Sequence, residues 1–446
     1  MASNWITLKL GDVTKWSSGG TPKKSEASYW DGDIPWISAS SMDGHLYTES
    51  KLKITEEGLA NGTRLAPKGS ILLLVRGSIL HQKMQVGLTT RAVAFNQDVK
   101  CLIANEDYLD PWYLLLWFKA KEQELLAIVE STGIGAGKFD TKLLSKYPIE
   151  IPPQDERERI KNFGKALFDK TTNIAKTNQT LEQMAQALFK SWFVNFDPVI
   201  DNALTAGTNV GDFPVALQHH AEQRKQALQL PDFKLLPDDI RALFPSEFEQ
   251  TDEPSIGIRG WIPKGWESKN LSDLLDVKYG KDHKKLSEGQ YPVYGSGGLM
   301  RSVDKFLYEG ESVLIPRKGT LSNIMYVNET FWTVDTMFFT IPKMDNVAKF
   351  SFYLLKRLDF NAMNVGSAVP SMTTKVLNSL QLVCPPEKVL VKFDELVELY
   401  FSKTRANNEN SSQLEKLRDT LLPKLISGEL QLPDTEQQVE NKKALA

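Results

Sequence analysis

The fold is decided by residues 151–193, which read IPPQDERERIKNFGKALFDKTTNIAKTNQTLEQMAQALFKSWF. The pair Pro152-Pro153 opens the segment, and proline is favoured at the first position of a helix. Apolar side chains then return every seven residues, which is typical of a coiled coil rather than of a helix lying on a sheet. The seam consists of Ile160, Leu167, Ile174, Leu181 and Leu188, with Phe163 and Met184 at complementary positions. The sequence therefore predicts one long helix that needs a partner.

A matching segment lies 233 residues further along the chain, again after a proline pair. Its seam positions are Phe393, Tyr400, Asn407, Leu414 and Leu421. Asn407 would be a buried polar residue in the seam, and such residues fix register at some cost in stability. Because each seam needs a partner, we expect the two helices to pair with each other. The alternative is two unrelated amphipathic helices.

The repeated helix belongs to a longer internal duplication. Trp5, Leu10 and Asp12 recur at an offset of 261 as Trp266, Leu271 and Asp273. Gly69 and Arg76 recur at an offset of 241, as Gly310 and Arg317. From Gly133 onward the offset stays at 233, so that Gly133, Thr141-Lys142 and Pro152-Pro153 match Gly366, Thr374-Lys375 and Pro385-Pro386. The chain is therefore predicted to be a tandem duplication.

Each copy begins with a part whose short apolar runs are separated by glycine and proline, which indicates strands in a mixed α/β domain. The runs SILLLVRG and SVLIPRKG are examples from the two copies. We expect a mixed α/β (α+β) fold in which two globular domains are separated by a pair of long antiparallel helices, with pseudo-twofold internal duplication. The predicted boundaries are 1–150 for domain 1, 151–194 for the central long helix, 195–265 for a connector, 266–385 for domain 2, 386–430 for the C-terminal long helix and 431–446 for a disordered tail.

Composition excludes several classes of protein. The 446 residues are 41% hydrophobic and 24% charged, as in an ordinary globular chain. Two cysteines and five scattered histidines make neither a disulfide framework nor a zinc pattern. There is no apolar run of membrane-spanning length and no visible export signal, so we expect a cytoplasmic protein without a membrane partner. The 53 basic and 56 acidic residues give a net charge of −3, which neither indicates nor excludes nucleic acid.

No catalytic motif is convincing. Gly133–Lys138 resembles a phosphate-binding loop, but its spacing is one residue short and Phe139 replaces the hydroxyl residue. Glu267-Ser268-Lys269 has the form of part of a nuclease metal site, without an obvious aspartate to complete it. We therefore expect no catalytic residues, no metal and no cofactor in this chain.

Basic residues instead gather in corresponding loops of the two copies. Lysine and arginine neutralise phosphates or read guanine, while small hydroxyl residues contact phosphates or bases. Cations in the loops at strand ends are often merely solvated, which is the alternative for any single loop. Because the pattern recurs in both copies, we predict DNA contact by Lys23, Lys24, Arg76, Ser78, Lys138, Lys142, Lys281, Lys284, Lys285, Arg317, Lys318, Thr320, Ser367 and Lys375.

Taken in order, these features resemble the specificity (S) subunit of type I restriction-modification enzymes. The resemblance covers almost the whole chain, and it depends on the order of many motifs in a duplicated frame. The motifs are Gly20-Thr21-Pro22, Tyr29-Trp30-x-Gly32-x-Ile34-Pro35-Trp36-Ile37, Leu74-Val75-Arg76-Gly77, Ile151-Pro152-Pro153, Trp192-Phe193-x-x-Phe196-Asp197-Pro198, Ile262-Pro263-x-Gly265-Trp266, Tyr291-Pro292-Val293-Tyr294-Gly295 and Leu421-Leu422-Pro423-Lys424-Leu425. The second copy lacks the Tyr-Trp-x-Gly-x-Ile-Pro-Trp-Ile stretch and resembles another subtype of recognition domain.

The resemblance implies a non-catalytic subunit with two target-recognition domains, each reading one half of a bipartite, asymmetric sequence in double-stranded DNA. The paired helices would set the spacing between the half-sites. Two methyltransferase subunits would dock on the helices, and a motor-nuclease subunit would join them. S-adenosylmethionine, ATP and Mg would then be held by those partners. Two alternatives stay open: a recognition subunit of another multisubunit restriction or methylation system, or a coiled-coil scaffold that does not bind DNA.

Overall fold

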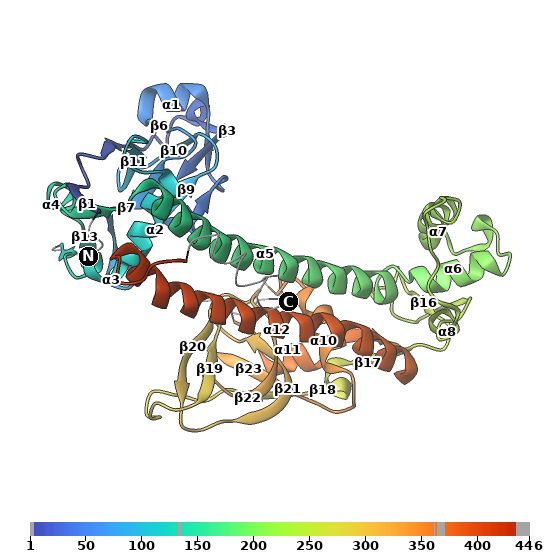
Figure 1. The fold of residues 1–446 in the computed structure, drawn as a ribbon. Helices are drawn as coiled ribbons and strands as arrows, with labels where there is room; N and C mark the ends of the chain where they lie inside the picture. The colour runs from blue at the N-terminus through green and yellow to red at the C-terminus, as the bar shows by residue number, and fades with distance from the viewer. Residues whose placement is uncertain (1–3, 133–134, 361, 364–370, 434–446) are drawn as a thin grey trace, which may run out of the picture. The chain divides into compact units, whose positions relative to one another are not determined.

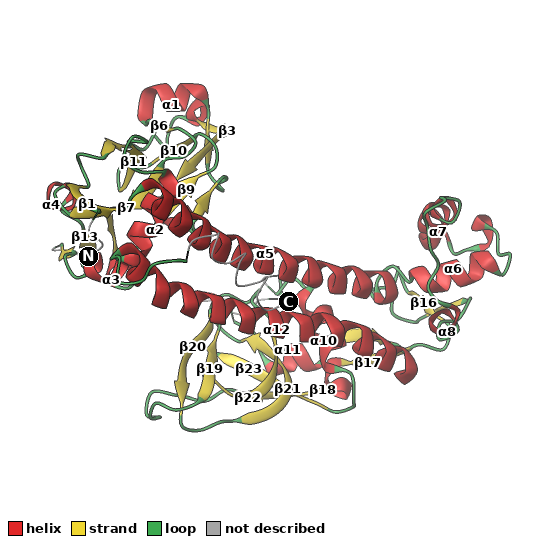
Figure 2. Cartoon of the chain, viewed as in Figure 1, coloured by secondary structure: helices red, strands yellow, loops and turns green. Residues whose placement is uncertain are grey.

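The computed structural model describes residues 4–132, 135–360, 362–363 and 371–433. The chain divides into two compact units, of which unit 1 comprises residues 1–175 and 408–446 and unit 2 comprises residues 176–407. Two 40-residue helices, α5 (Gln154–Phe193) and α12 (Glu387–Ile426), each contribute to both units. Figures 1 and 2 show these helices and the strands of the mixed α/β fold. The predicted fold class, with two domains and two long helices, is confirmed. The predicted domain boundaries stay a prediction.

Unit 1 is built on a five-stranded sheet with the order β2-β11-β7-β9-β4 and a four-stranded sheet with the order β5-β3-β10-β6. Strand β7 is buried along its whole length, as its continuous apolar run ILLL requires. The strands are β1 (Ile6–Lys9), β2 (Thr14–Ser18), β3 (Trp30–Ile37), β4 (Leu46–Tyr47), β5 (Lys53–Ile54), β6 (Leu65–Ala66), β7 (Ile71–Leu74), β8 (Arg76–Gly77), β9 (Val86–Thr89), β10 (Val93–Phe95), β11 (Val99–Ala104), β12 (Glu130–Ser131), β13 (Gly137–Lys138) and β14 (Pro148–Ile151).

The short helices of unit 1 begin where the sequence offers caps. The Asp110 carboxylate accepts hydrogen bonds from the first backbone N–H groups of α2, and Pro111 occupies the first helical position. The Asp140 carboxylate caps α4 in the same way. The helices are α1 (Glu56–Gly62), α2 (Pro111–Ala120), α3 (Glu122–Leu126) and α4 (Thr141–Ser145).

Unit 2 contains a six-stranded sheet with the order β18-β23-β21-β22-β19-β20. Its strands are β15 (Phe248–Gln250), β16 (Trp261–Pro263), β17 (Glu267–Asn270), β18 (Leu275–Tyr279), β19 (Tyr291–Gly295), β20 (Gly298–Val303), β21 (Tyr308–Pro316), β22 (Met325–Thr333), β23 (Met337–Pro342) and β24 (Gln381–Cys384). Its short helices are α6 (Asp197–Thr205), α7 (Val215–Ala227), α8 (Asp238–Arg241), α9 (Leu271–Leu274), α10 (Ala348–Lys356) and α11 (Thr374–Asn378).

The two units repeat one topology. The central order β2-β11-β7-β9 of unit 1 corresponds to β18-β23-β21-β22 of unit 2, and all neighbours within each set are antiparallel. Strand β1 pairs with β14 just as β17 pairs with β24. The bounds of β14, α4 and α5 differ from those of β24, α11 and α12 by the offset of 233 seen in the sequence. The elements thus repeat as the predicted duplication requires.

The long helices bury their seams in both units. In unit 1, Ile160 lies in the same hydrophobic cluster as Leu422 and Leu425, and Leu167 is also buried. In unit 2, the C-terminal part of α5 packs on the N-terminal part of α12, because the rings of Phe189 and Phe193 contact Phe393. The segments of the two helices are therefore antiparallel there.

The polar position of the seam is also buried. Asn407 is 7% exposed, and its Nδ2 donates to Asn178 Oδ1 over 2.7 Å. Ile174, Leu181, Leu188, Tyr400, Leu414 and Leu421 are partly buried. Met184 does not lie in the seam, because it is 46% exposed while its neighbour Ala185 is buried. The prediction for Met184 was wrong by one position, since the helix turns by 3.6 rather than 3.5 residues.

The connector 195–265 is more ordered than its proline-rich composition indicates. Helices α6 and α7 share a small apolar cluster of Ile200, Ala203, Phe213, Leu217 and Ala221. Of the predicted tail, residues 434–446 lie outside the described part of the chain. No helix among the described residues is long and apolar enough to cross a membrane.

Ion pairs join α6 to α7. The Asp197 carboxylate lies 2.6 Å from His220 Nε2, and the Asp201 carboxylate accepts from Arg224 Nε over 2.8 Å. Both aspartates are buried. The hydrogen bond to Asp197 raises the pKa of His220 above its usual value, although partial burial opposes this. The aspartate of the Phe196-Asp197-Pro198 motif therefore holds the connector together.

This pairing predicts a pH-dependent stability. A raised pKa in the folded state means that the stabilisation is fully present below the unfolded pKa of about 6.5 and is lost as the pH rises through the folded pKa. Urea unfolding should therefore show a midpoint that falls across this range. His220→Gln should remove that part of the slope, and the exposed neighbour His219 provides the control as His219→Gln. An unchanged slope in His220→Gln would contradict the role of the pair.

Candidate nucleic-acid interface

In unit 1, three of the predicted DNA contacts lie together. Strand β8 follows the buried strand β7 and pairs with β13, so that Arg76 is opposite Lys138. Helix α4 begins three residues after β13 and carries Lys142. Arg76, Lys138 and Lys142 are exposed and line one cavity with a volume of about 490 Å³. The topology thus brings together residues that lie more than 60 positions apart in the sequence.

The charges of this cavity favour an anionic partner. Among the described residues, no hydrogen bond or ion pair engages the side-chain nitrogens of Arg76, Lys138 or Lys142. Lys100, on β11, lines the same cavity and donates to Ser18 Oγ. The carboxylates there are Asp98, Glu130 and Asp140. Asp140 is already used as a helix cap, and the hydrogen bonds from the backbone N–H groups of Lys142 and Leu143 lower its pKa.

The loop that carries Lys23 and Lys24 is held at the border of this cavity by two tryptophans. Trp36 Nε1 donates to the carbonyl of Gly20, and Trp30 Nε1 donates to the carbonyl of Lys23, both over 3.1 Å. Thr21 Oγ1 donates to the side chain of Gln97, which lines the cavity. The Tyr-Trp-x-Gly-x-Ile-Pro-Trp-Ile stretch therefore positions a basic loop. Lys23 and Lys24 themselves are exposed.

Glycine is required where this loop leaves β2. A Cβ atom on Gly19 would lie 1.9 Å from the carbonyl oxygen of Phe95, which is far inside contact distance. The corresponding Gly280 of unit 2 has the same constraint, because its Cβ would lie 2.0 Å from the carbonyl oxygen of Val334. Both loops thus need a residue without a side chain at the strand end.

Unit 2 contains an equivalent arrangement. Arg317 follows the buried end of β21, and its guanidinium lies 5.4 Å from the ring centre of Tyr279 and donates to the carbonyl of Asp335. Lys318 forms a β-bridge with Ser371, which is the residue 233 positions after Lys138. Tyr279 Oη lies 3.3 Å from Thr374 Oγ1 at the start of α11, next to the exposed Lys375.

The remaining predicted contacts lie nearby or cannot be placed. Trp332 Nε1 donates to the carbonyl of Lys281, which anchors the loop of the exposed Lys281, Lys284 and Lys285. Thr320 is exposed in the loop after Lys318, and Ser78 is exposed in the 3-10 helix Ser78–His81. Ser367 lies outside the described residues. The contact of all these residues with DNA stays a prediction.

Sequence reasoning missed Lys100 in the basic face of unit 1 and Tyr279 in that of unit 2. Lys100 lies within a strand, and only its pairing opposite Ser18 places its side chain beside the cavity. The contact of Tyr279 with Arg317 depends on the strand order. The available signal was the position of both residues next to the basic loops.

The predicted contacts that the structure describes thus gather in one basic face in each copy. Among the described residues, no group of three or more His, Cys, Asp or Glu side chains could hold a metal ion. The geometry thus defines a protein with two equivalent basic faces, one in each copy of a duplicated chain.

Comparison with known proteins gives the class. The family described as "Type I restriction modification DNA specificity domain" matches residues 2–183 and 263–416. The type I restriction enzyme MjaIX specificity subunit of Methanocaldococcus jannaschii is 25% identical and covers 97% of this chain and 94% of its own length. The HindI specificity subunit of Haemophilus influenzae is 25% identical over 71% of this chain and 76% of its own. A crystal structure of the S subunit of a type I restriction-modification system from M. genitalium covers 97% of both chains, with 17% identity and a TM-score of 0.48.

The chain belongs to the family of type I restriction-modification DNA specificity proteins. It is a DNA sequence-recognition subunit, the non-catalytic component of such a system. The resemblance predicted from the order of the motifs is confirmed.

Replacing the two equivalent arginines tests whether the basic faces bind DNA. Arg76→Ala and Arg317→Ala should each weaken binding to the cognate duplex by about 1–3 kcal/mol, measured by fluorescence anisotropy. Lys416→Ala, at an exposed position of α12, is the matched control and should bind normally. A loss that depends on sequence indicates base contact, whereas a uniform loss with a shallower salt dependence indicates phosphate contact. Unchanged affinity in both arginine variants would refute the assignment.

Proposed function

We propose that each unit reads one half of a bipartite, asymmetric DNA target, and that α5 and α12 set the spacing between the half-sites. The observation that carries this proposal is the recurrence of one basic face in both units, on the same strand order. Family membership makes DNA the partner of the chain, and two equivalent faces favour two contacts per target.

The difference between the copies supports an asymmetric target. In unit 1, Trp36 and Trp30 hold the basic loop, whereas in unit 2 Trp332 of β22 holds the equivalent loop. Arg317 lies against Tyr279, while the equivalent of Tyr279 in unit 1 is Ser18. Because base readout depends on which donors and rings line the face, the two units are suited to different base sequences.

The lengths of α5 and α12 are compatible with their proposed role of setting the spacing between the half-sites. A 40-residue helix spans about 60 Å, at 1.5 Å per residue. The duplex rises about 3.4 Å per base pair, so such a helix covers roughly 18 base pairs.

The partners follow from the family. Methyltransferase and motor-nuclease subunits are the partners of a type I specificity subunit, and the duplication favours two methyltransferase subunits, one for each repeat. S-adenosylmethionine, ATP and Mg are held by those subunits in this proposal. The chain contributes recognition and geometry, and its partners contribute the chemistry.

The methylation pattern tests the proposal. The chain would be expressed with its neighbouring methyltransferase subunit in a host without DNA methylation, and adenine methylation would be mapped by sequencing. We expect a new bipartite motif that is absent without this chain. Replacing residues 1–150 by those of another specificity subunit should change one half of the motif and leave the other. A change in both halves would refute the assignment of one half to each unit.

Deleting one heptad from each long helix tests separately whether α5 and α12 set the half-site spacing. Removing residues 172–178 and the equivalent residues 405–411 shortens both helices by two turns and keeps their seams in phase. The half-site spacing should fall by about three base pairs, because seven residues span about 10.5 Å. Deleting the seven residues from α5 alone is the control and should disrupt pairing. An unchanged half-site spacing in an assembled, active complex would contradict the proposal that the helices set this spacing.

A further inference from the structure

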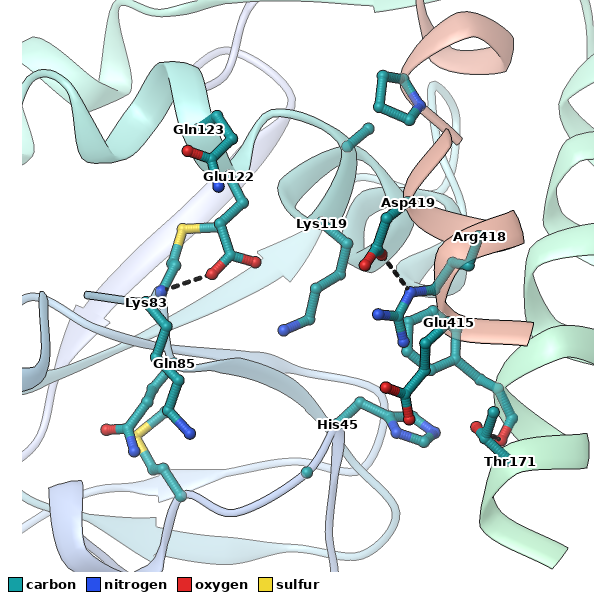
Figure 3. A pocket seen from close by; sticks show the side chains of 16 residues that line it. His45, Lys83, Gln85, Lys119, Glu122, Gln123, Thr171, Glu415, Arg418 and Asp419 are labelled. Carbon is teal, nitrogen blue, oxygen red and sulfur yellow. Dashed lines mark hydrogen bonds and ion pairs between the residues drawn. The ribbon is translucent and has the colours of Figure 1, made fainter. Parts of the chain in front are cut away.

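A second cavity in unit 1 shares no lining residue with the DNA face. It lies among α2, the segment around His45, and residues of α5 and α12 that belong to this unit. Its volume is about 480 Å³, within the range of small-molecule sites. Its charged and titratable lining residues are His45, Lys83, Lys119, Glu122, Glu415, Arg418 and Asp419. Figure 3 shows the Lys119 side chain extending into the space between these groups.

The carboxylates of this cavity have donors, but two of its cations have no acceptors. Glu122 accepts from the backbone N–H of Met84 over 2.7 Å, and Asp419 accepts from Arg418 Nε over 2.7 Å. Glu415 accepts from Ser411 Oγ. Within the described part of the chain, no hydrogen bond or ion pair reaches the Nζ atoms of Lys83 and Lys119. The cavity thus holds three cations and three carboxylates, but two of its ammonium groups have no hydrogen-bond acceptor among the described residues.

At the equivalent site in unit 2, the lysine forms an ion pair with a glutamate. Lys119 is the ninth residue of α2, and Lys356 is the ninth residue of α10. Lys356 Nζ lies 2.6 Å from Glu182 Oε1 of α5, and the residue 233 positions after Glu182 is Glu415. Both partners of this ion pair therefore recur in unit 1, but there they line the cavity without pairing.

Unit 1 also adds a cation at this site. Arg418 occupies the position of α12 that corresponds to the buried Ala185 of α5. Its guanidinium lies over the ring of Phe168, and only its Nε is engaged by Asp419. The equivalent position of unit 2 therefore carries no charge.

Two buried polar atoms in the cavity also lack partners among the described residues, namely His45 Nε2 and Gln85 Oε1. Burial, together with Lys119 and Arg418, lowers the pKa of His45 to about 4, so the imidazole is neutral near pH 7. These two atoms have almost no exposed surface, so a ligand in the cavity meets the cations and the three carboxylates instead. It must accept hydrogen bonds from the cations and be able to donate one to a carboxylate. Monohydrogen phosphate has both properties, whereas a carboxylate only accepts.

We propose that this cavity binds a small phosphate-bearing anion through Lys119, Lys83 and the free guanidinium nitrogens of Arg418. The bound phosphate gives Lys119 the acceptor that Glu182 gives Lys356 in unit 2. It also links α2 to α12, so that the globular part of unit 1 and its long helix share one ligand.

Calorimetric titration with sodium phosphate tests the site, using the full chain in its methyltransferase complex at constant ionic strength. We expect saturable binding that is stronger than binding of acetate. Lys119→Met keeps the aliphatic stem and should weaken phosphate binding by about tenfold or more, because a charge-assisted hydrogen bond is lost. Lys356→Met at the equivalent position and Lys142→Met at the DNA face are matched controls and should bind phosphate as the unaltered chain does.

Three results would overturn the proposal. The first is the absence of saturable binding, and the second is acetate binding as strong as phosphate binding. The third is a loss in Lys142→Met equal to that in Lys119→Met, which would assign the phosphate to the DNA face. If Lys119→Met does not fold, the exposed Lys83 provides Lys83→Met, which should weaken binding and leave the fold intact.

Discussion

A helix of 40 residues with an apolar seam cannot remain alone in water, and this constraint organises the chain. Each of the two long helices gives one part of its seam to each unit, where it completes a core that the strands begin. In unit 1, Ile160 packs in the same cluster as the sheet residues Leu72 and Leu102. In unit 2, Phe393 packs with Trp192 and Phe350. The helices are therefore part of the domains as well as connections between them. Because the hydrophobic effect drives burial of the helix seams, the segments that connect the domains are also needed for the domains to fold.

The sequence predicts the parts of this design that repeat. Heptads and a constant offset of 233 are visible without coordinates, and they identify α5 and α12. Periodicity alone does not tell which face of a helix is covered at a given turn, and Met184 shows the limit. Its neighbour Ala185 is buried instead, because the helix follows a period of 3.6 residues where the packing permits it.

The candidate interface was predictable only loop by loop. Arg76 and Lys138 were selected because each is a basic residue of a loop, but their pairing across β8 and β13 is a long-range contact. Lys100 shows what such reasoning omits: a cation inside a strand becomes part of the face only when the strand order places it there. Local composition indicates which residues are available for binding, and topology decides which of them act together. The ordered structure of the connector likewise depends on tertiary contacts, such as that between Asp197 and His220, which cannot be predicted from its composition.

The two units preserve their strand order while their contacts with the long helices differ in charge. In unit 2, Lys349 is 2% exposed and lies within ion-pair distance of Glu311, Asp394 and Glu398. A buried ammonium group requires such partners, because its desolvation is costly.

The equivalent positions of unit 1 carry the opposite arrangement. The second residue of α2 is Trp112, where the second residue of α10 is Lys349. The helix positions of Asp394 and Glu398 correspond to Lys161 and Lys165, and Lys165 lies over the ring of Trp112. If the globular part of unit 2 packed on the helix segment of unit 1, Lys349 would meet Lys161 and Lys165. It would then lose its ion pairs with Asp394 and Glu398. Specificity can come from repulsion in the wrong pairing as well as from attraction in the right one, and these charge differences favour the pairing in which each domain uses its own helix segment.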